Sequence, residues 1–331
     1  MLLSLLLINT ILIYIYYSRD NFIAELAISF LPYIIIVLWI IIIIEFFLTF
    51  NYIFKKCTNK PILIIISITL LICSTWLEIK YLPEYFWSYN QPDLAVRLDN
   101  KQQWIKVFYA NILYKNTDYQ SLQEKIQQEN PDIVILVEFS DEHEDAMKEF
   151  FKENYSYMNR NSWSTMLAWD VVFSKIPLEN ITETHLVEPW SWNYSYMKIQ
   201  CENCWSWVDL YVIHTAAPVS YKNFYMRNTQ IAKLSYDLLN SQNSWIPTMI
   251  IWDFNLSPRS YYYKQLVEEW NMLNALSFQS PDYTRSLYSH KIFRSHIDHL
   301  FISPEIKVSL INIEDLSGSD HRSFTFSFAA N

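Results

Sequence analysis

The stretch PTMIIWDFNLSP, residues 247–258, decides the fold of this chain. Four apolar residues in a row, from Met249 to Trp252, predict a strand that is buried on both faces. The strand ends at Asp253 and Asn255, whose side chains project to the same side because side chains alternate along a strand. A carboxylate beside an amide suits water or a phosphate group. The same residues also fit a strand that runs into an Asx turn with no chemical role.

The region from about residue 99 to the C-terminus continues this pattern on both sides of the opening stretch. Alternating or continuous apolar runs predict strands at 105–112, 133–137, 165–174, 208–213, 296–302 and 324–328. Helices are predicted at 118–129, 141–151 and 221–239. The sequence therefore indicates a folded domain of mixed helix and strand.

Polar side chains recur at the ends of these strands, namely Asn111, Glu138, His214, Asp253, Asn255, Asp298, Asp320 and His321. A turn or a hydrogen-bonded core group explains each of them alone. A carboxylate at the end of a buried strand is either hydrogen-bonded or bound to metal, because an isolated buried charge is too costly. If the eight converge, oxygen ligands from Glu138, Asn111 and Asp320 suit a hard cation such as Mg²⁺ or Mn²⁺.

The first eighty residues differ from the rest because they are almost entirely apolar. Apolar runs cover 2–17, 28–50 and 61–77, and a membrane helix needs about 20 such residues. One short run is also typical of a buried core helix, but three in succession favour an anchor. No Lys or Arg precedes the first run and no small-residue cleavage site follows it, which disfavours a cleaved signal peptide. We predict a three-span membrane anchor at 1–80, a linker at 81–100 and the domain at 101–331.

The charges of the short loops predict how this anchor is oriented. Three lysines lie within 55–60, between the second and third runs, whereas the loop after the first run has only Arg19, offset by Asp20 and Glu25. The positive-inside rule places the lysine loop in the cytoplasm. The sequence thus predicts a multi-pass protein of the cell membrane whose domain lies outside the cytoplasm.

The charge of the domain argues against one class of partner. Residues after 100 hold 19 of the 25 Lys and Arg residues and 27 of the 34 Asp and Glu residues, a net charge of −8. Binding of nucleic acid through its phosphates needs clustered cations, so an acidic domain is poorly suited to bind nucleic acid. A local basic groove would be enough for such binding.

Cys201 and Cys204 form a CxxC pair without a second pair nearby. A zinc site is therefore weakly supported. A local disulfide and two buried thiols both remain open for this pair.

Glycine occurs once, as Gly318, whereas about 7 % of residues is usual, and tryptophan occurs thirteen times. Several tryptophans, among them Trp252 and Trp270, stand where a turn with positive φ would favour glycine. We hypothesise that many are glycines in the cell, from a genetic code in which UGA encodes glycine but was translated as tryptophan. A lineage rich in tryptophan and poor in glycine is the alternative. UGG codons at Trp252 and Trp169 would exclude the hypothesis.

Six short segments together resemble one enzyme superfamily. In order they are ANIL (110–113), PDIVILVE (131–138), VIHT (212–215), IIWDFN (250–255), HIDHLFIS (296–303) and GSDHRS (318–323). Their order and separations resemble the endonuclease/exonuclease/phosphatase superfamily of metal-dependent phosphoesterases, over residues 105–328. The resemblance implies a four-layer α/β sandwich, with two packed mixed sheets flanked by helices and the site at one edge. A three-span anchor before such a domain is similar to the membrane-bound, YafD-like members.

The resemblance also implies roles for the residues at the strand ends. Asn111 and Glu138 match the first metal-site residues of the superfamily, and Asp320 matches a second acidic metal ligand. His214 matches a histidine that contacts the scissile phosphate.

The remaining four residues match two catalytic pairs. In the pair matched by Asp253 and Asn255, the Asp orients or deprotonates the attacking water and the Asn steadies phosphate oxygens. Asp298 and His321 match an Asp-His pair in which the histidine is a general base or a phosphate contact. Together these roles describe metal-assisted hydrolysis.

Two tryptophans depart from the pattern of the superfamily, which has glycine before the Asp-Phe-Asn motif and near Ala168, where this chain has Trp252 and Trp169. An indole beside Asp253 is expected to crowd the site. The sequence predicts a membrane-anchored, Mg²⁺- or Mn²⁺-dependent phosphoesterase whose partners are a phosphoester substrate and the lipid bilayer, and it supports no inference of a protein partner. The alternative is a catalytically inactive, membrane-tethered binding module of the same fold.

Overall fold

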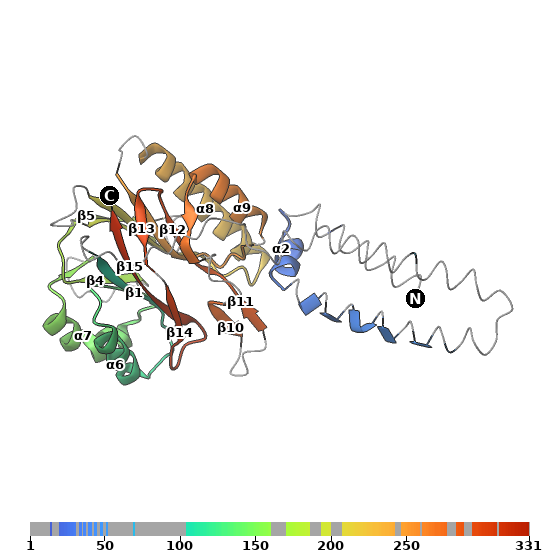
Figure 1. Ribbon diagram of the computed structural model, residues 1–331, viewed down its shortest axis with the longest axis horizontal. Coiled ribbons are helices and arrows are strands. Elements are labelled where there is room, and N and C mark those ends of the chain that lie inside the picture. Colours follow the sequence, from blue (N-terminus) through green and yellow to red (C-terminus); the bar gives the residue numbers. More distant parts are fainter. Residues whose placement is uncertain are drawn as a thin grey trace. The chain divides into compact units, whose positions relative to one another are not determined.

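The computed structural model describes residues 20–30, 104–159, 170–185, 193–199, 207–241, 246–258, 260–276, 283–287, 293–309 and 311–330, with isolated positions between 14 and 69. The chain divides into two compact units. One comprises Met1–Asn90 with Arg259–Tyr261, and the other comprises Gln91–Pro258 with Tyr262–Asn331. The second unit contains both large sheets, several of whose strands are labelled in Figure 1. It also contains all of the candidate site residues.

The helices and strands of the second unit follow one another in a mixed order. They are β1 (Ile105–Asn111), α6 (Tyr119–Glu129), β2 (Ile133–Val137), α7 (Asp141–Asn154), β3 (Tyr157–Met158), β4 (Asp170–Ser174), β5 (Leu178–His185), β6 (Asn193–Ile199), β7 (Val208–His214), α8 (Tyr221–Ser241), β8 (Thr248–Asp253), α9 (Tyr261–Trp270), β9 (Leu273–Asn274), β10 (Arg285–Leu287), β11 (Phe293–Ser295), β12 (Asp298–Ile302), β13 (Ile306–Val308), β14 (Asn312–Asp315) and β15 (Arg322–Ala330).

Two mixed sheets form the centre of this unit. The first has the strand order β13-β15-β1-β2-β4-β3, with β14 also paired to β15, and the second has the order β5-β6-β7-β8-β12-β9. In the first sheet β1 and β2 are parallel, and in the second sheet β7 and β8 are parallel. The other ladders of the two sheets are antiparallel. Both sheets therefore mix parallel and antiparallel pairs, as predicted.

The sheets pack face to face through a shared apolar core. Val107 and Ile135 of the first sheet belong to the same buried cluster as Val212, Ile251 and Leu300 of the second. Because side chains alternate along each strand, the intervening residues face outward, where helices cover them.

Each outer face is covered by one pair of helices (Figure 1). On the first sheet, Leu122 of α6 and Phe151 of α7 are buried with Phe173 of β4, and the Phe151 and Phe173 rings stack 3.6 Å apart between centroids. On the second sheet, Leu234 of α8 and Leu266 of α9 belong to the outer cluster. The predicted α/β sandwich with helices outside two mixed sheets is confirmed.

Local sequence signals set the ends of the first two helices of this unit. Asp118 is the N-cap of α6 and accepts a hydrogen bond from the Ser121 N–H, and Asn130 ends the helix with a φ of +46°. Ser140 begins α7 with a capping box that His143 completes. Caps of this kind satisfy backbone groups that the helix itself leaves without partners.

The first unit is described over one complete helix, α2 (Phe22–Ser29), whose N-cap is Asn21. Of the three predicted spans, 2–17 and 61–77 lie outside the described residues except for Tyr14 and Thr69, and 28–50 is described only in part. Over the positions that the structure describes, no helix is both long and apolar enough to cross a membrane. The predicted linker at 81–100 also lies outside them.

His299 lies fully buried on the outer face of the second sheet and fixes the chain that follows β8. Its Nε2 is 2.8 Å from the carbonyl oxygen of Leu256, which can only accept, so Nε2 carries the proton. Its Nδ1 is 2.9 Å from Nδ2 of Asn274, which can only donate, so Nδ1 has none. Burial and the neighbouring His296 lower the pKa of His299 to about 3, although the contacts with Leu256 and Asp298 oppose this.

We expect His299 to make the protein less stable in acid. The unfolded chain protonates this ring below its ordinary pKa of 6.5, whereas the folded chain does so only near pH 3. The free energy of unfolding should therefore fall as the pH drops from about 6.5 to about 3, by up to about 1.4 kcal/mol per pH unit from this residue. The free energy of unfolding, measured by urea titration at several pH values, should fall less steeply with decreasing pH in His299→Gln than in the wild type. An equal dependence on pH in the two proteins would contradict the assignment.

Candidate functional site

The strand register brings the predicted residues to one edge of the two sheets. In the parallel pair β1–β2, Asn111 lies opposite Val137, the residue before Glu138. In the second sheet Asp253 lies opposite His214 of the parallel strand β7 and opposite Asp298, the first residue of the antiparallel strand β12. The ends of parallel strands and the start of an antiparallel neighbour share one edge, so these side chains meet.

Asn111 joins the two carboxylates at the centre of this edge. Its side-chain Nδ2 donates to Oε1 of Glu138 at 3.0 Å and to Oδ2 of Asp253 at 2.9 Å. Its own Oδ1 accepts from the Leu113 N–H at 3.0 Å, which fixes the amide in this orientation. Oε2 of Glu138 accepts a further bond from the Tyr114 N–H at 3.1 Å. The Asn111 amide thus bridges a carboxylate of each sheet.

Glu138 and Asn255 both take backbone conformations that L residues seldom adopt. Their φ angles are +61° and +49°, and neither is glycine. Such a residue costs roughly 1 to 3 kcal/mol, and residues of this kind cluster at functional sites. Glu138 directly follows the buried strand β2, and Asn255 lies two residues after the end of β8.

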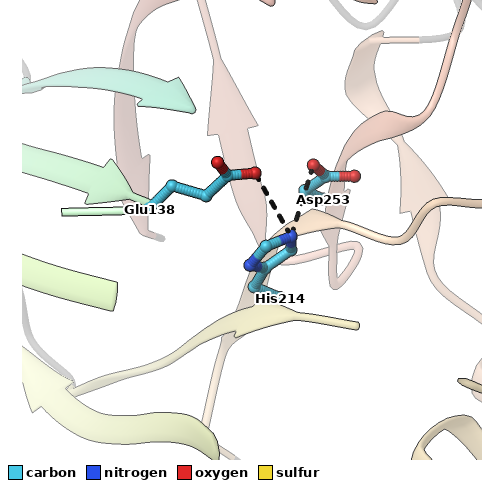
Figure 2. Close-up of side chains that lie close together, drawn as sticks. All are labelled: Glu138, His214 and Asp253. Atoms are coloured by element: carbon cyan, nitrogen blue, oxygen red, sulfur yellow. Dashed lines mark ion pairs between the residues drawn. The ribbon is translucent and has the colours of Figure 1, made fainter. Parts of the chain in front are cut away.

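His214 faces both bridged carboxylates, as Figure 2 shows. Its Nε2 is 3.8 Å from Oε1 of Glu138 and 3.8 Å from Oδ2 of Asp253. The histidine and Asp253 are buried and Glu138 is partly buried, so their mutual attraction is poorly screened by water when the histidine is protonated.

Asp298 and His321 form a buried pair on the other side of Asp253. Nδ1 of His321 is 2.9 Å from Oδ2 of Asp298, and its Nε2 is 3.6 Å from Oδ2 of Asp253. Oδ1 of Asp298 accepts from the Tyr109 hydroxyl at 2.9 Å, and the Asp298 N–H donates to Thr284 Oγ1 at 3.0 Å. The imidazole is therefore held between two carboxylates.

The burial of these groups shifts their pKa values. Burial and the charge of Asp298 raise the pKa of Asp253. Burial also acts to raise the pKa of Asp298, but the charge of His321 and hydrogen bonds from His321, Thr284 and Tyr109 lower it. Burial acts to lower the pKa of His321, but Asp298 and Asp253 outweigh it and raise that pKa to about 9. At neutral pH His321 is thus an imidazolium beside an ionised Asp298.

Within the part of the chain that the structure describes, two groups of three side chains have ligand atoms within 4.8 Å of one another: Glu138, His214 and Asp253, and Asp253, Asp298 and His321. The carboxylates of the first group suit a hard divalent cation, which prefers oxygen ligands. The second group suits a metal less well, because a metal ligand must be deprotonated and His321 holds its proton. Glu138 is therefore the residue that would hold Mg²⁺ or Mn²⁺, on the side of the site that faces Asp253.

Asp320 and Asn255 lie near this centre but face other partners. Oδ2 of Asp320 accepts from Nε of Arg285 at 2.8 Å, and Asp320 is in neither group of candidate ligands among the described residues. Nδ2 of Asn255 donates to the Thr215 carbonyl at 3.0 Å, and its N–H donates to Oδ1 of Asp253 at 3.0 Å. Asn111 turns its amide nitrogen toward the carboxylates, so in this conformation it orients them and presents no oxygen ligand.

Sequence reasoning missed three residues that shape the site. Tyr109 lies two positions before Asn111 in β1 and so faces the same side, which was a signal for its contact with Asp298. Arg227 of α8 is fully buried and its Nη1 donates to the Asn255 carbonyl at 3.1 Å. Arg285 lies in the short strand β10, and three residues give too little periodicity to predict.

The indole of Trp252 does not crowd the site, contrary to expectation. Trp252 belongs to the buried cluster on the outer face of the second sheet, where its ring stacks on Phe254 at 3.3 Å between centroids. Asp253, the next residue of β8, faces the opposite way. Among the described residues, none with a positive φ is a tryptophan; after Trp270 it is Asn271 that has a φ of +49°. Trp169, Cys201 and Cys204 lie outside the described residues.

The Endonuclease/Exonuclease/phosphatase family matches residues 108–321, which is more than half of the chain. The chain belongs to this family. Members of the endonuclease/exonuclease/phosphatase family generally hydrolyse phosphoester bonds and generally use a divalent metal. A comparison with curated protein sequences found no match.

Several solved structures share the fold of this chain at low sequence identity. An endonuclease/exonuclease/phosphatase family protein from Bacteroides thetaiotaomicron is 15 % identical with a TM-score of 0.56, covering 70 % of this chain and 99 % of its own. The human nocturnin catalytic domain with bound sulfate is 19 % identical with a TM-score of 0.51, covering 73 % and 100 %. The mannosyl-6-phosphatase of B. thetaiotaomicron is 14 % identical with a TM-score of 0.55, covering 68 % and 99 %. At these identities the likeness shows the fold alone.

We expect Asp298→Asn to lower the pKa of His321 in the metal-free protein. The substitution removes the main charge that raises this pKa, and burial, which lowers it, is then opposed only by the remaining charges of Asp253 and Asp320. Titration of the His321 ring by NMR should move from about pH 9 toward or below the ordinary 6.5. Asp237→Asn, the same change in α8, should leave the titration unaltered. A His321 pKa near 9 in the Asp298 variant would contradict the assigned pair.

Proposed function

We propose that this protein is a membrane-anchored, divalent-metal-dependent phosphoesterase. One observation carries the proposal: Glu138, Asp253 and His321, which lie at or next to the ends of separate strands of the two sheets, come together at the Asp253 carboxylate. Asn111 bridges the first two, and Nε2 of His321 lies 3.6 Å from Asp253. Buried acids and an imidazolium at one edge suit the activation of water beside a phosphorus atom.

Asp253 is the group that accepts the proton of the attacking water. Its two oxygens are held by the Asn255 N–H and the Asn111 amide, so the carboxylate is fixed before substrate binds. Burial raises its pKa, which makes it a stronger base than an exposed aspartate. The water gives a proton to Asp253, its oxygen bonds to phosphorus, and the ester bond to the leaving oxygen breaks.

His321 stabilises the negative charge that develops on the phosphoryl group. Asp298 holds Nδ1, so the ring keeps its proton and directs Nε2–H toward the space beside Asp253. His214 approaches the same point from β7 and offers a second contact for phosphate oxygens. Fixed donors of this kind stabilise a transition state without reorganising during the reaction.

Glu138 would hold the divalent cation, whose positive charge neutralises the charge on the phosphoryl oxygens and the leaving oxygen when it is bound. The protein supports this role by pairing the Glu138 carboxylate with the Asn111 amide. Outer hydrogen bonds of this kind orient metal ligands.

The substrate proposed is a nucleic acid, a lipid headgroup or a small phosphoester. The similarity to the mannosyl-6-phosphatase supports a small phosphoester as the substrate. The sulfate bound to nocturnin supports the binding of an anion by a protein of this fold. The net charge of −8 in the part after residue 100 disfavours long duplex DNA.

Membrane anchoring rests on the sequence of the first eighty residues. Three apolar runs and the lysine-rich loop at 55–60 support a multi-pass, YafD-like member whose catalytic domain lies outside the cytoplasm. A tether of this kind favours lipid or envelope substrates.

We expect Asp253→Asn to abolish hydrolysis of a generic phosphodiester, with kcat reduced roughly 10²- to 10⁴-fold because the base is lost. Removing divalent metal with a chelator should abolish wild-type activity, and Mg²⁺ or Mn²⁺ should restore it. Asp237→Asn is the matched control and should retain activity. Turnover that needs no metal, or that survives Asp253→Asn, would contradict the proposed mechanism, and a wild-type protein without turnover would favour the inactive binding module.

We expect the full chain to remain with the membrane pellet after washing at alkaline pH. Protease added outside intact cells should cleave the domain after residue 100. Release into the supernatant would contradict the anchor, and cleavage only after the cells are opened would contradict the orientation.

A further inference from the structure

Arg285 lies in the β10–β11 hairpin, which is hydrogen-bonded to the segment around His321. The short strands β10 and β11 pair with each other, and Arg285 forms an isolated bridge with His321. The Ser286 N–H donates to the Asp320 carbonyl at 2.8 Å, and the Arg322 N–H donates to the Thr284 carbonyl at 2.7 Å. The position of the arginine is thus fixed relative to the catalytic histidine.

The guanidinium of Arg285 is only partly used within the protein. Its Nε donates to Oδ2 of Asp320 at 2.8 Å, and in the described part of the chain this is its one hydrogen bond. Nη1 and Nη2 therefore keep their N–H donors for another acceptor. The side chain is 29 % exposed and that of Asp320 is 25 % exposed, so a small anion has access to the pair.

The charges around Arg285 keep it a cation. Burial acts to lower its pKa, but Asp320, Asp253 and Asp298 raise it. Its place next to the catalytic groups follows from the pairing of Arg285 with His321, whose Nε2 lies 3.6 Å from Oδ2 of Asp253. A partly buried arginine with free terminal donors and a carboxylate behind it is well suited to bind phosphate through two parallel N–H bonds.

We propose that Nη1 and Nη2 of Arg285 bind the non-bridging phosphoryl oxygens of the substrate, and that Asp320 is a positioning residue that holds the guanidinium. This inference rests on the proposed phosphoesterase function. It assigns Asp320 a role other than metal ligand. Oδ2 of Asp320 is occupied by Arg285, and Glu138, His214 and Asp253 form their group of candidate ligands without it.

The first test compares Arg285→Met and Arg285→Lys with Arg294→Met, measured with saturating Mn²⁺. Arg294 is exposed on β11, opposite Ser286, so its variant removes the same charge from the same hairpin. Loss of the two phosphate bonds in Arg285→Met should raise KM and the inhibition constant of inorganic phosphate roughly 10- to 100-fold. Arg285→Lys should recover part of this loss, and Arg294→Met should change both constants less than about threefold.

The second test separates orientation from metal binding. Asp320→Asn should weaken inorganic phosphate binding, measured by calorimetry, by roughly 10-fold while leaving the affinity for Mn²⁺ within about twofold of the wild type. A loss of Mn²⁺ affinity of 10-fold or more would overturn the assignment of Asp320. Phosphate binding unchanged in Arg285→Met, with normal thermal unfolding, would overturn the role of Arg285.

Failure of this inference is distinguishable from failure of the proposed function. Metal-dependent hydrolysis of phosphodiesters by the wild type, together with normal phosphate binding by the Arg285 and Asp320 variants, would support the proposed function and contradict the roles of Arg285 and Asp320. Absence of turnover by the wild type, together with phosphate binding that depends on Arg285, would contradict the proposed function and support the anion site.

Discussion

The hydrogen bonds that Asn111 donates to Glu138 and Asp253 are the contacts on which the site depends, because they link a carboxylate of the first sheet to one of the second. Tyr109, two residues earlier in β1, makes a second crossing to Asp298. The Asn111 and Tyr109 side chains both face the second sheet because residues two positions apart in a strand project to the same side. The apolar core between the sheets, which includes Val107 and Ile251, sets the separation at which these polar contacts form. The packing of the two sheets therefore determines the geometry of the site.

Charge balance explains why the edge of the sandwich carries so many donors. Asp253 and Asp298 lie opposite each other in the β8–β12 ladder and are fully buried, which neither could be without compensation. Asn111, Tyr109 and the imidazolium of His321 supply it. Removing a partner from such a buried set leaves an uncompensated charge, which is costlier than losing an exposed ion pair. The arrangement also leaves the Glu138 side of Asp253 suited to the cation that we propose.

Sequence patterns predicted the central strands well and the peripheral elements poorly. The strand β2 (Ile133–Val137) is the predicted one, and β8 ends at Asp253 as expected, because long apolar runs bounded by polar residues define buried strands. The strands β10 and β11 were not predicted, since three residues carry no periodicity. The helix α9 was also missed, although Tyr263, Leu266 and Trp270 are spaced on one helical face.

By itself the sequence determined which side chains end the buried strands, because the alternation of apolar and polar residues is written along the chain. Only the tertiary structure decided what each of them faces. It turned the Trp252 ring to the outer helices, the Asn111 nitrogen to two carboxylates and Asp320 to Arg285. These outcomes depend on the register between strands that are far apart in the chain, such as Asp298 opposite Asp253. A single strand carries no information on that register, because its partners are chosen by packing across the whole sandwich.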